Sequence, residues 1–340
     1  MPIDYEIEHN HENGYIGIVS QYGAIELGRI DEEDDATANK SVTLINFTKY
    51  ADFDAMTTGE GITSETTYGK TGTFKEISYN GRSWLSLSSL GSGNYYKGAC
   101  KKITIPADEN GEVGAKNFKA QCRVNYETVK RLRQTGMLQF VVGDEDDAVL
   151  ALIYFNKNSK TSNTAHYRCR VGKQDKNKIN FTPNYQNLTT KSGNLISITK
   201  TGGLFAFDIC GKKYQFRDDT LAEKKAKTLT VFMGNMPGAV ESFFSTSSNL
   251  GRMLLTDLTF RKDNVLYTYD IPNRYSEGCV VKVDGESTKV YVNDVESPGD
   301  EVLGSKYFLA PPGETKVRFY YSEFSTPAPT IKAYIREAYL

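Results

Sequence analysis

The residues that could carry out chemistry in this chain are few. His9, His11 and His166 are its only histidines, and none stands beside a serine or cysteine nucleophile motif. The phosphate-binding P-loop and the glycine-rich turn of dinucleotide-binding proteins are absent. His9 and His11 could share one face of a strand, but a metal centre would still need a third and a fourth ligand. An exposed pair in a polar segment is the simpler interpretation, and the sequence predicts that the chain is not an enzyme.

The densest run of carboxylates in the body of the chain is Asp144–Asp147, between two apolar segments. Consecutive acids in a hairpin loop point outward and repel one another, so a solvated loop is the first interpretation. Asp144 and Asp146 could instead offer loop oxygens to a Ca²⁺ ion, the one cofactor that the sequence suggests. General acid/base catalysis is the third hypothesis, although the Glu-x-Asp-x-x-Glu pattern of jelly-roll glucanases is absent.

Aromatic residues are the other candidates for binding, because the chain has 22 tyrosines and 17 phenylalanines but one tryptophan. An aromatic ring can stack on the apolar face of a sugar, while amides and carboxylates bond the hydroxyls. Trp84 alternates with Leu85 and Leu87, so simple alternation places its ring on the outer face of a strand. Tyr95 and Tyr96 lie in a loop of glycine, serine and asparagine. We predict a carbohydrate site at Trp84, Tyr95 and Tyr96, with loop anchoring as the alternative for the tyrosines.

Strand signals dominate the elements that must position these residues. About a dozen short alternating or apolar segments follow one another within residues 41–262, separated by turn signals such as Asn80-Gly81. Only Tyr126–Gln134 and Leu221–Lys227 look helical, and each is two or three turns at most. The fold class predicted is therefore all-β, with a jelly-roll β-sandwich over residues 41–262 and a small β domain over residues 263–340.

The charge distribution divides the chain further. The formal net charge is −1, which argues against nucleic acid or an anionic membrane as a partner. Residues 1–35, however, contain ten acidic residues and a single base, Arg29, so the rest of the chain is basic. We interpret residues 1–40 as an acidic N-terminal arm and linker, which is either solvated or docked on a basic neighbour. Tyr15–Val19 and Ala24–Leu27 look like short strands, so a hairpin is the alternative for this segment.

The cysteines and apolar segments bear on the cellular compartment. The cysteine count is odd and no CxxC pair occurs, so buried thiols of a reducing cytosol are expected at Cys100, Cys122, Cys169, Cys210 and Cys279. Ala148–Phe155 is too short to span a membrane and should be a strand buried on both faces. The first ten residues lack the basic start and apolar core of a signal peptide, so we expect a protein that is made in a reducing cytosol.

Four motifs close the sequence. Gly278–Asp284 fits the pattern G-D-x-V-x-I-D, and Val290–Asn293 fits V-x-L-N-G. Phe308–Val317 fits F-F-x-L-x-P-G-x-N-x-I, and Arg336–Leu340 fits R-E-x-Y-L. Residues 263–340 thereby resemble the C-terminal domain of distal tail proteins from long-tailed phages of Gram-positive hosts. The resemblance implies a galectin-like β-sandwich on a tail ring, without catalysis.

The chain departs from the family pattern at several positions, and the matching residues predict two turns. Cys279, Asp294 and Thr315 depart from the pattern, and the N-terminal belt domain that closes the family's hexameric ring is not recognisable. Asn293 should take a tight turn between two strands, and Pro312 and Gly313 should set a turn before the last strand pair. We predict that these three residues shape the domain that attaches the chain to the tail.

The central segment carries a second resemblance. Phe205–Phe216 is similar to the paired strands, and Leu229–Gly234 with Leu255–Phe260 to the closing strands, of a concanavalin A-like jelly roll of the carbohydrate-binding type. Phage tail proteins often contain such modules. The combination implies a module for polysaccharide of the host cell wall.

The expected function is that of a structural component of a phage tail tip or baseplate, located in the virion. The expected partners are further copies in a homo-oligomer, a hexamer or a trimer, the tail tube, the tail-tip hub and the host-wall polysaccharide. One alternative is a spacer or assembly protein that touches no sugar. A polysaccharide depolymerase on a jelly-roll scaffold is another, and a secreted lectin is disfavoured because no signal peptide is recognisable.

Overall fold

The chain forms two compact units, described here from a computed structural model. Unit 1 combines both ends of the chain, Met1–Ala38 and Leu266–Leu340, and unit 2 is Asn39–Val265. The structure describes residues 1–128, 133–183, 194–236, 241–242 and 252–335. Strands make up almost all of its regular structure, and the described helices are the 3₁₀ turns η1 (Tyr50–Ala55), η2 (Asp219–Leu221) and η3 (Pro298–Asp300). The predicted all-β class is confirmed.

The first sheet of unit 2 has nine strands. They are β5 (Thr57–Thr58), β8 (Lys97–Thr104), β10 (Gln134–Asp144), β11 (Val149–Lys157), β12 (Ala165–Val171), β13 (Gln174–Asp175), β14 (Ile179–Phe181), β18 (Ala226–Asn235) and β19 (Glu241–Ser242). Their order is β13-β12-β11-β10-β18-β8-β5, with β14 beside β12 and β19 beside β10. β10 is buried along its whole length, and β11 at every residue but Val149, so the predicted two-sided burial of Ala148–Phe155 is correct for the strand that forms there.

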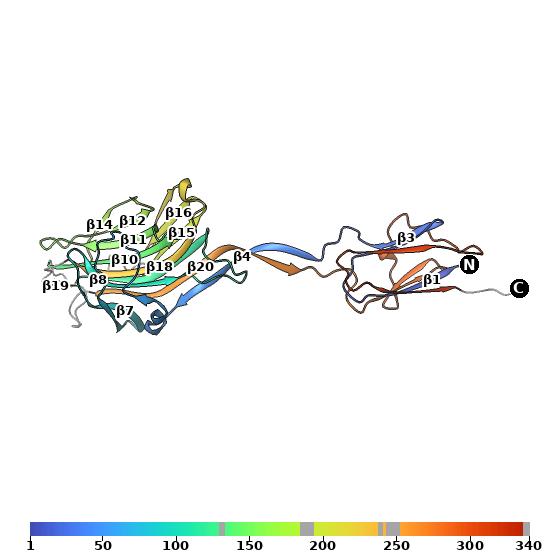
Figure 1. The fold of residues 1–340 in the computed structure, drawn as a ribbon, viewed down its shortest axis with the longest axis horizontal. Helices are drawn as coiled ribbons and strands as arrows, with labels where there is room; N and C mark the ends of the chain where they lie inside the picture. Colours follow the sequence, from blue (N-terminus) through green and yellow to red (C-terminus); the bar gives the residue numbers. More distant parts are fainter. Residues whose placement is uncertain (129–132, 184–193, 237–240, 243–251, 336–340) are drawn as a thin grey trace. The chain divides into compact units, whose positions relative to one another are not determined.

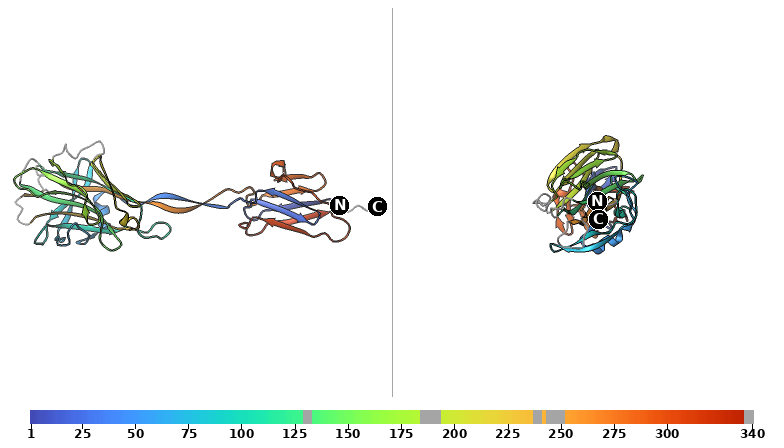
Figure 2. Two further views of the ribbon diagram at one scale, coloured as in Figure 1. Left: turned by 90° about the horizontal axis from the view of Figure 1, so that it is seen from above. Right: turned by 90° about the vertical axis from the view of Figure 1, so that its left-hand side faces the viewer.

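The second sheet has eight strands. They are β4 (Asp35–Phe47), β6 (Thr73–Tyr79), β7 (Arg82–Ser89), β9 (Phe118–Glu127), β15 (Leu195–Thr201), β16 (Leu204–Ile209), β17 (Lys212–Arg217) and β20 (Arg252–Asp270). Their order is β17-β16-β15-β9-β20-β7-β6, with β4 beside β20. The two sheets pack face to face as a jelly-roll sandwich, which is the part of Figures 1 and 2 that contains the cyan, green and yellow strands. The core between them combines residues from both sheets, such as Phe140, Ile153 and Phe207.

Unit 1 is a smaller β-sandwich. Its strands are β1 (Ile3–Glu8), β2 (Tyr15–Ser20), β3 (Gly23–Gly28), β21 (Val280–Asp284), β22 (Lys289–Val292), β23 (Val295–Glu296), β24 (Val317–Tyr321) and β25 (Thr330–Ile335). One sheet has the order β23-β22-β21-β1-β25 and the other the order β24-β2-β3. The core between them joins Ile3 and Ile7 of β1 to Ile16 and Ile18 of β2 and Val281 of β21.

The interpretation of residues 1–40 as an arm and linker is therefore wrong. β1 pairs with both β21 and β25, so the N-terminal segment is an inner strand of the sheet that residues 263–340 were expected to complete alone. The cause lies in its alternation. Ile3, Tyr5 and Ile7 are buried, whereas Asp4 and Glu6 are only partly exposed on the other face. Three of the ten acids that suggested a solvated arm, Asp4, Glu6 and Glu8, form the wet face of this strand.

The chain passes from unit 1 into unit 2 within β4 and returns within β20, and these two strands pair with each other. The predicted jelly-roll boundaries, residues 41–262, differ from those of unit 2 by two or three residues at each end. The predicted third part, residues 263–340, is only one portion of unit 1.

Two further predictions concern local structure. The stretch Tyr126–Gln134 was expected to be helical, but β9 continues to Glu127 and β10 begins at Gln134, while residues 129–132 are outside the described part. Leu221–Lys227 was also expected to be helical and contains only the end of η2 before β18 begins. Helix propensity is a weak preference that pairing with neighbouring strands overrides. No helix among the described residues is long and apolar enough to cross a membrane.

The predicted tight turn at Asn293 is present, whereas Pro312 and Gly313 form a bend, and the two strands that follow belong to different sheets. Asn293 and Asp294 both have positive φ, 49° and 65°, and connect β22 to β23 as a two-residue hairpin. This is the geometry of the type I′ turn, which asparagine and aspartate tolerate. Pro312 and Gly313 lie in the segment before β24, where Gly313 has a φ of 103°. The closing motif, with Arg336, is outside the described residues.

Candidate functional site

The candidate site lies on the outer face of the nine-stranded sheet. Along β12, Tyr167 and Cys169 point into the sandwich core, so His166, Arg168 and Arg170 must point outward. The neighbouring strand places Asn156 opposite His166 and Tyr154 opposite Arg168. We call the set the aromatic–polar strip; it comprises Tyr68, Tyr95, Tyr96, Tyr154, Asn156, His166, Arg168, Arg170 and Asp175.

Tyr95 is the exposed aromatic ring of the strip. Its side chain is 57% exposed, whereas Tyr68 and Tyr96 behind it are 8% and 5% exposed. The Tyr95 ring centroid lies 6.0 Å from that of Tyr68 and 5.5 Å from that of Tyr96, to which it is nearly perpendicular. Tyr68 in turn stacks on Phe232 of β18, at 5.6 Å. Buried rings therefore support Tyr95 from behind and leave much of its side chain open to a ligand.

A hydrogen bond links these aromatics to the sheet. The Tyr96 hydroxyl donates to Oδ1 of Asn156 over 3.0 Å, and both side chains are buried. Burial raises the pKa of Tyr96 to about 12, so its hydroxyl remains a donor at neutral pH. This contact fixes the orientation of the Asn156 amide, and its Nδ2 donates to no other described residue. The amide is thus available to bond a ligand hydroxyl.

The charged end of the strip is an ion cluster in which two arginines share one carboxylate. Asp175 accepts hydrogen bonds from Arg168, from Nε of Arg170 at 2.7 Å and from the Tyr154 hydroxyl at 3.2 Å. Burial acts to raise the pKa of Asp175, but the two guanidinium groups outweigh it and hold that pKa below its usual value. The Arg168 guanidinium also lies over the Tyr154 ring, 5.7 Å from its centroid. A carboxylate held by two arginines is a fixed hydrogen-bonding group and is poorly suited to act as a general acid.

His166 joins the two ends of the strip. It lies beside Tyr154, with ring centroids 6.3 Å apart and planes nearly perpendicular. Burial lowers the pKa of His166 to about 4, with the positive charges of Arg168 and Lys178 adding to the effect. The imidazole is therefore neutral at pH 7, with one donor and one acceptor nitrogen. A supported ring, an amide, a neutral imidazole and a fixed ion cluster together suit a polar, uncharged ligand with an apolar face.

Of the three predicted sugar-binding residues, Tyr95 and Tyr96 lie together in the strip and Trp84 does not. Trp84 lies on β7 in the other sheet, where it is 4% exposed and its Nε1 donates to the Tyr79 carbonyl at 2.9 Å. Alternation correctly separated it from Leu85 and Leu87, which lie in the core, but its own face of the sheet is covered. Trp84 therefore cannot stack on a ligand in this structure, and Tyr96 is an anchoring residue. Among the three candidates only Tyr95 is open to solvent.

The predicted Ca²⁺ ligands have other partners. Oδ1 of Asp144 accepts from the backbone N–H groups of Asp146 and Ala148, at 3.0 and 2.9 Å. Asp146 forms an ion pair with Lys224, and Glu145 accepts from the backbone N–H of Lys225. These contacts shape the loop between β10 and β11 and balance part of its charge. A Ca²⁺ role for Asp144 and Asp146 stays a prediction.

Several residues of the strip were missed from the sequence, although a signal existed for some. The alternation in residues 165–171 places His166, Arg168 and Arg170 together on the polar face of a half-buried strand, but this alternation is common in antiparallel sheets and does not by itself mark a binding site. Tyr68 and Asp175 gave no such signal, because Tyr68 lies in a loop and Asp175 in the two-residue strand β13, and the position of both depends on the fold.

Comparison with known proteins supports the jelly-roll fold of unit 2. No protein family and no curated protein matches the sequence. Among solved structures, the CBM2 module of the evolved Dit of Lactobacillus casei BL23 phage J-1 matches with a TM-score of 0.52 and 19% identity. The match covers 99% of that module and 67% of this chain, the share that unit 2 makes up. This similarity establishes the jelly-roll fold.

Two further structures are similar at lower scores. A peanut lectin matches with a TM-score of 0.35 and 12% identity over 68% of this chain and 100% of its own. A Bacillus subtilis protein of unknown function with a galectin-like fold matches with a TM-score of 0.37 and 10% identity, over 67% of this chain and 99% of its own.

Proposed function

We propose that the chain is a component of a phage tail tip or baseplate whose unit 2 binds host-wall glycan through the aromatic–polar strip. The observation that carries the proposal is the exposed Tyr95 ring, supported from behind and next to fixed polar groups, on a fold shared with a phage carbohydrate-binding module. Unit 1 then serves attachment to other tail proteins, the tail tube and the hub, as its C-terminal motifs suggest.

The chemistry of the strip fits a neutral sugar ring. A pyranose stacked on Tyr95 would cover an apolar surface that is otherwise exposed. Its hydroxyls would reach groups with both donor and acceptor capacity, such as the Asn156 amide and the neutral His166 ring. One shallow site of this kind binds weakly, and several copies in a homo-oligomer raise the overall affinity through avidity.

The experiment is a binding assay of the full chain on a panel of Gram-positive wall polysaccharides. Tyr95→Ala should weaken binding to the glycan that the wild type retains. Tyr269→Ala is the matched control, since Tyr269 is 46% exposed and belongs to unit 1. Retention of no wall glycan by a chain shown to be folded would reject glycan binding and favour the spacer. Mass spectrometry and immunogold labelling of virions test the location in the tail.

We also propose that the chain has no catalytic activity. The carboxylates that a depolymerase would use, Asp144–Asp147, include two that bond the loop backbone or Lys224, and Asp175 is held by two arginines. Release of reducing ends from a bound wall polysaccharide would contradict this. Addition of Ca²⁺ should leave the thermal midpoint of unfolding unchanged, because Asp144 and Asp146 already have partners. A rise in the midpoint at millimolar Ca²⁺ that is lost in Asp144→Asn/Asp146→Asn would instead establish a metal site at these two residues.

A further inference from the structure

The two units carry opposite charges of similar size. Unit 1 contains 21 acidic and nine basic residues, whereas unit 2 contains 21 acidic and 32 basic residues. Their formal charges are thus −12 and +11, which the net charge of −1 conceals. The aromatic–polar strip belongs to the basic unit. The acidic unit must therefore meet its partners by a different surface, and its electrostatic field favours basic ones.

A groove follows the outer face of the three-stranded sheet of unit 1. Gly17, in the middle strand, pairs with Glu26 of β3 on one side and with Tyr320 of β24 on the other. Glu26, Gly17 and Tyr320 thus form one row across the three strands. Because Gly17 has no side chain, the groove is low at this position, with the Glu26 carboxylate on one side and the Tyr320 ring on the other. A Cβ atom at Gly17 would lie 2.8 Å from the Tyr15 hydroxyl, so the glycine makes room for the Tyr15 ring, which forms the floor and whose hydroxyl donates a hydrogen bond to Glu26. The groove has a volume of about 880 Å³.

The rim of the groove is acidic, although Glu26 and Asp34 accept hydrogen bonds from neutral side chains. Asp300 raises the pKa of the Arg274 guanidinium, and Glu32 lies near enough to add to this effect. Five carboxylates line the groove, from Glu26, Glu32, Glu33, Asp34 and Glu323, and no lysine or arginine does. None of the five forms an ion pair with another described residue. Oε2 of Glu32 is inaccessible to solvent and has no hydrogen-bond partner among the described residues. Beside the groove, the negative charges of Glu12, Asp34 and Asp35 raise the pKa of Asp270.

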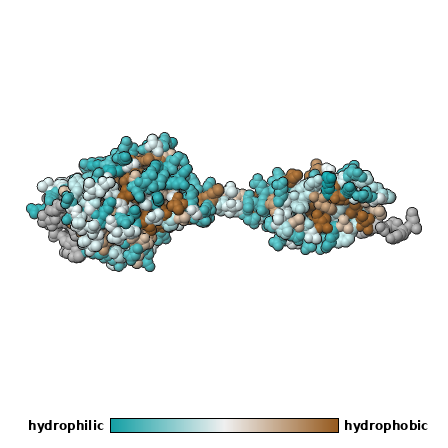
Figure 3. Space-filling view, in the orientation of Figure 1, coloured by the Kyte–Doolittle hydropathy of each residue, from teal (hydrophilic) through white to brown (hydrophobic). Residues whose placement is uncertain are grey.

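The same groove exposes large apolar side chains. Ile30 is 78% exposed, Tyr320 48% and Tyr321 38%, and all three line it together with Phe324. Brown, hydrophobic residues reach the surface of unit 1 between hydrophilic ones in Figure 3. Exposed aromatic residues framed by charge are typical of protein-binding surfaces. A bare cation would satisfy the carboxylates and leave these side chains unused.

We infer that this groove of unit 1 binds a lysine- or arginine-rich segment of a partner protein that carries an apolar anchor residue. The basic side chains meet the acidic rim, and the anchor enters between Tyr320 and Ile30. Nucleic acid and anionic membranes are repelled by the charge of unit 1. β24 is also an edge strand, so an extended segment can pair with its free backbone groups, as in β-strand addition.

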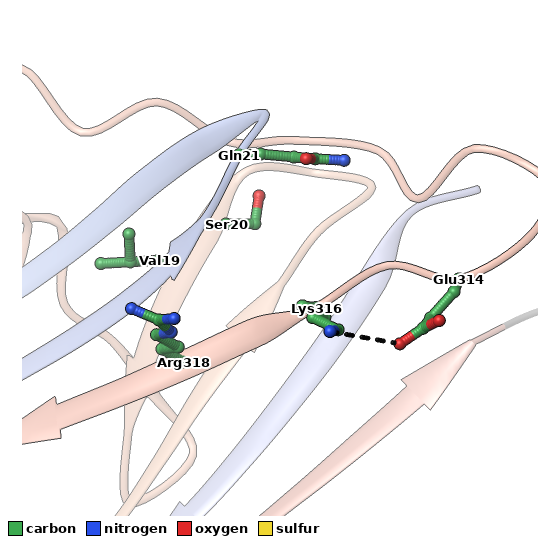
Figure 4. A pocket seen from close by; sticks show the side chains of 6 residues that line it. All are labelled: Val19, Ser20, Gln21, Glu314, Lys316 and Arg318. Atoms are coloured by element: carbon green, nitrogen blue, oxygen red, sulfur yellow. Dashed lines mark ion pairs between the residues drawn. The ribbon is translucent and has the colours of Figure 1, made fainter.

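A neighbouring hollow sets the polarity of the bound segment. Val19 lines both the groove and a second hollow of about 550 Å³, which Lys316 and Arg318 also line. Figure 4 shows the Arg318 and Lys316 side chains of that hollow, with Lys316 facing Glu314 in an ion pair of 3.8 Å. The basic residues of the partner therefore lie at the Glu33–Glu323 end, and any acidic residue lies at the Arg318 end.

The test uses the full chain and defined peptides in fluorescence anisotropy. The probes are a labelled decalysine, the same peptide with two central leucines, and a decaglutamate. Glu33→Lys/Glu323→Lys changes two exposed groove residues. Glu8→Lys/Glu277→Lys makes the same charge change at exposed positions of unit 1 outside the groove. Tyr320→Ala removes the aromatic wall while leaving the charge unchanged.

The leucine-bearing peptide should bind most tightly, in a salt-sensitive manner, and decaglutamate should not bind. The groove variant should weaken binding on the order of tenfold more than its control. Tyr320→Ala should abolish the advantage of the leucines. Equal losses in the two charge variants, or a leucine effect that survives Tyr320→Ala, would show only bulk attraction and overturn the proposal. Salt-sensitive dimerisation lost in the groove variant would identify a second copy as the occupant and overturn it too. The result is independent of glycan binding.

Discussion

Acidification should destabilise unit 2 through His166. Burial lowers its pKa to about 4, whereas an unfolded histidine has a pKa of about 6.5. Between these values the unfolded chain binds a proton that the folded chain excludes. The stabilising contribution is therefore complete above pH 6.5 and is lost progressively as the pH falls toward 4.

The size of the effect follows from the pKa difference. Each pKa unit corresponds to ~1.4 kcal/mol, so the full difference gives about 3 kcal/mol at most. His166 is 9% exposed, and partial contact with solvent reduces this value. Between pH 7 and pH 5 we expect a loss of about 1–2 kcal/mol in the free energy of unfolding. Aspartates and glutamates titrate mainly below this range, which separates their contribution from that of His166.

The assay is urea unfolding followed by tryptophan fluorescence. Trp84 is the only tryptophan, is buried and lies in unit 2, so its emission reports that unit alone. His9, which belongs to unit 1 and whose pKa burial also lowers, does not affect this signal. The His166→Gln variant should show a flat profile from pH 7 to pH 5. An identical slope in the wild type and the variant would refute the argument that a buried neutral imidazole supports the strip.

Two other predictions test the binding ring and the packing of the sheet. Tyr95→Ala should weaken wall-glycan binding about tenfold, because a sugar stacked on the ring removes ~50 Å² of apolar surface from water and contributes about 1.2 kcal/mol to binding. Isothermal titration calorimetry should show this loss of affinity. The thermal midpoint of the variant and the affinity of the Tyr269→Ala control should stay unchanged. Gly98→Ala should destabilise unit 2 by ~1–3 kcal/mol, because its Cβ would lie 1.9 Å from the Met233 carbonyl oxygen. Gly299→Ala, with no atom within 4 Å, should be neutral in the same calorimetric measurement, and equal midpoints for both glycine variants would refute the packing argument.

The sequence predicted the strands well because their alternation is local. The apolar run at Ala148–Phe155, the Asn293 hairpin and the boundaries of the jelly roll all depend on neighbouring residues. The role of residues 1–40, in contrast, does not depend on neighbouring residues alone. β1 is completed by β21 and β25, more than 270 residues away, and no local pattern indicates that pairing. The alternation of Ile3, Tyr5 and Ile7 was not recognised as a strand, because the density of acidic residues in this segment suggested an arm.

The site was harder to predict for the same reason. Alternation gave the face of Trp84 but could not show that other side chains cover it. Tyr95 was found because an aromatic residue in a glycine-rich loop is a recognisable signal, whereas its support by Tyr68 and Phe232 depends on packing across the sheet. The Asp175 cluster also requires two strands to lie side by side. Binding sites assembled from several strands are visible only after the fold is known.

Hydrogen–deuterium exchange of the full chain with a wall polysaccharide that it retains is the most direct test of the central claim. Glycan bound at the aromatic–polar strip should slow exchange in β11, in β12 and in the loop of residues 90–96, while exchange in unit 1 and in the eight-stranded sheet stays unchanged. Protection in the eight-stranded sheet or in unit 1 alone would contradict the account, because the glycan would then bind away from the aromatic–polar strip.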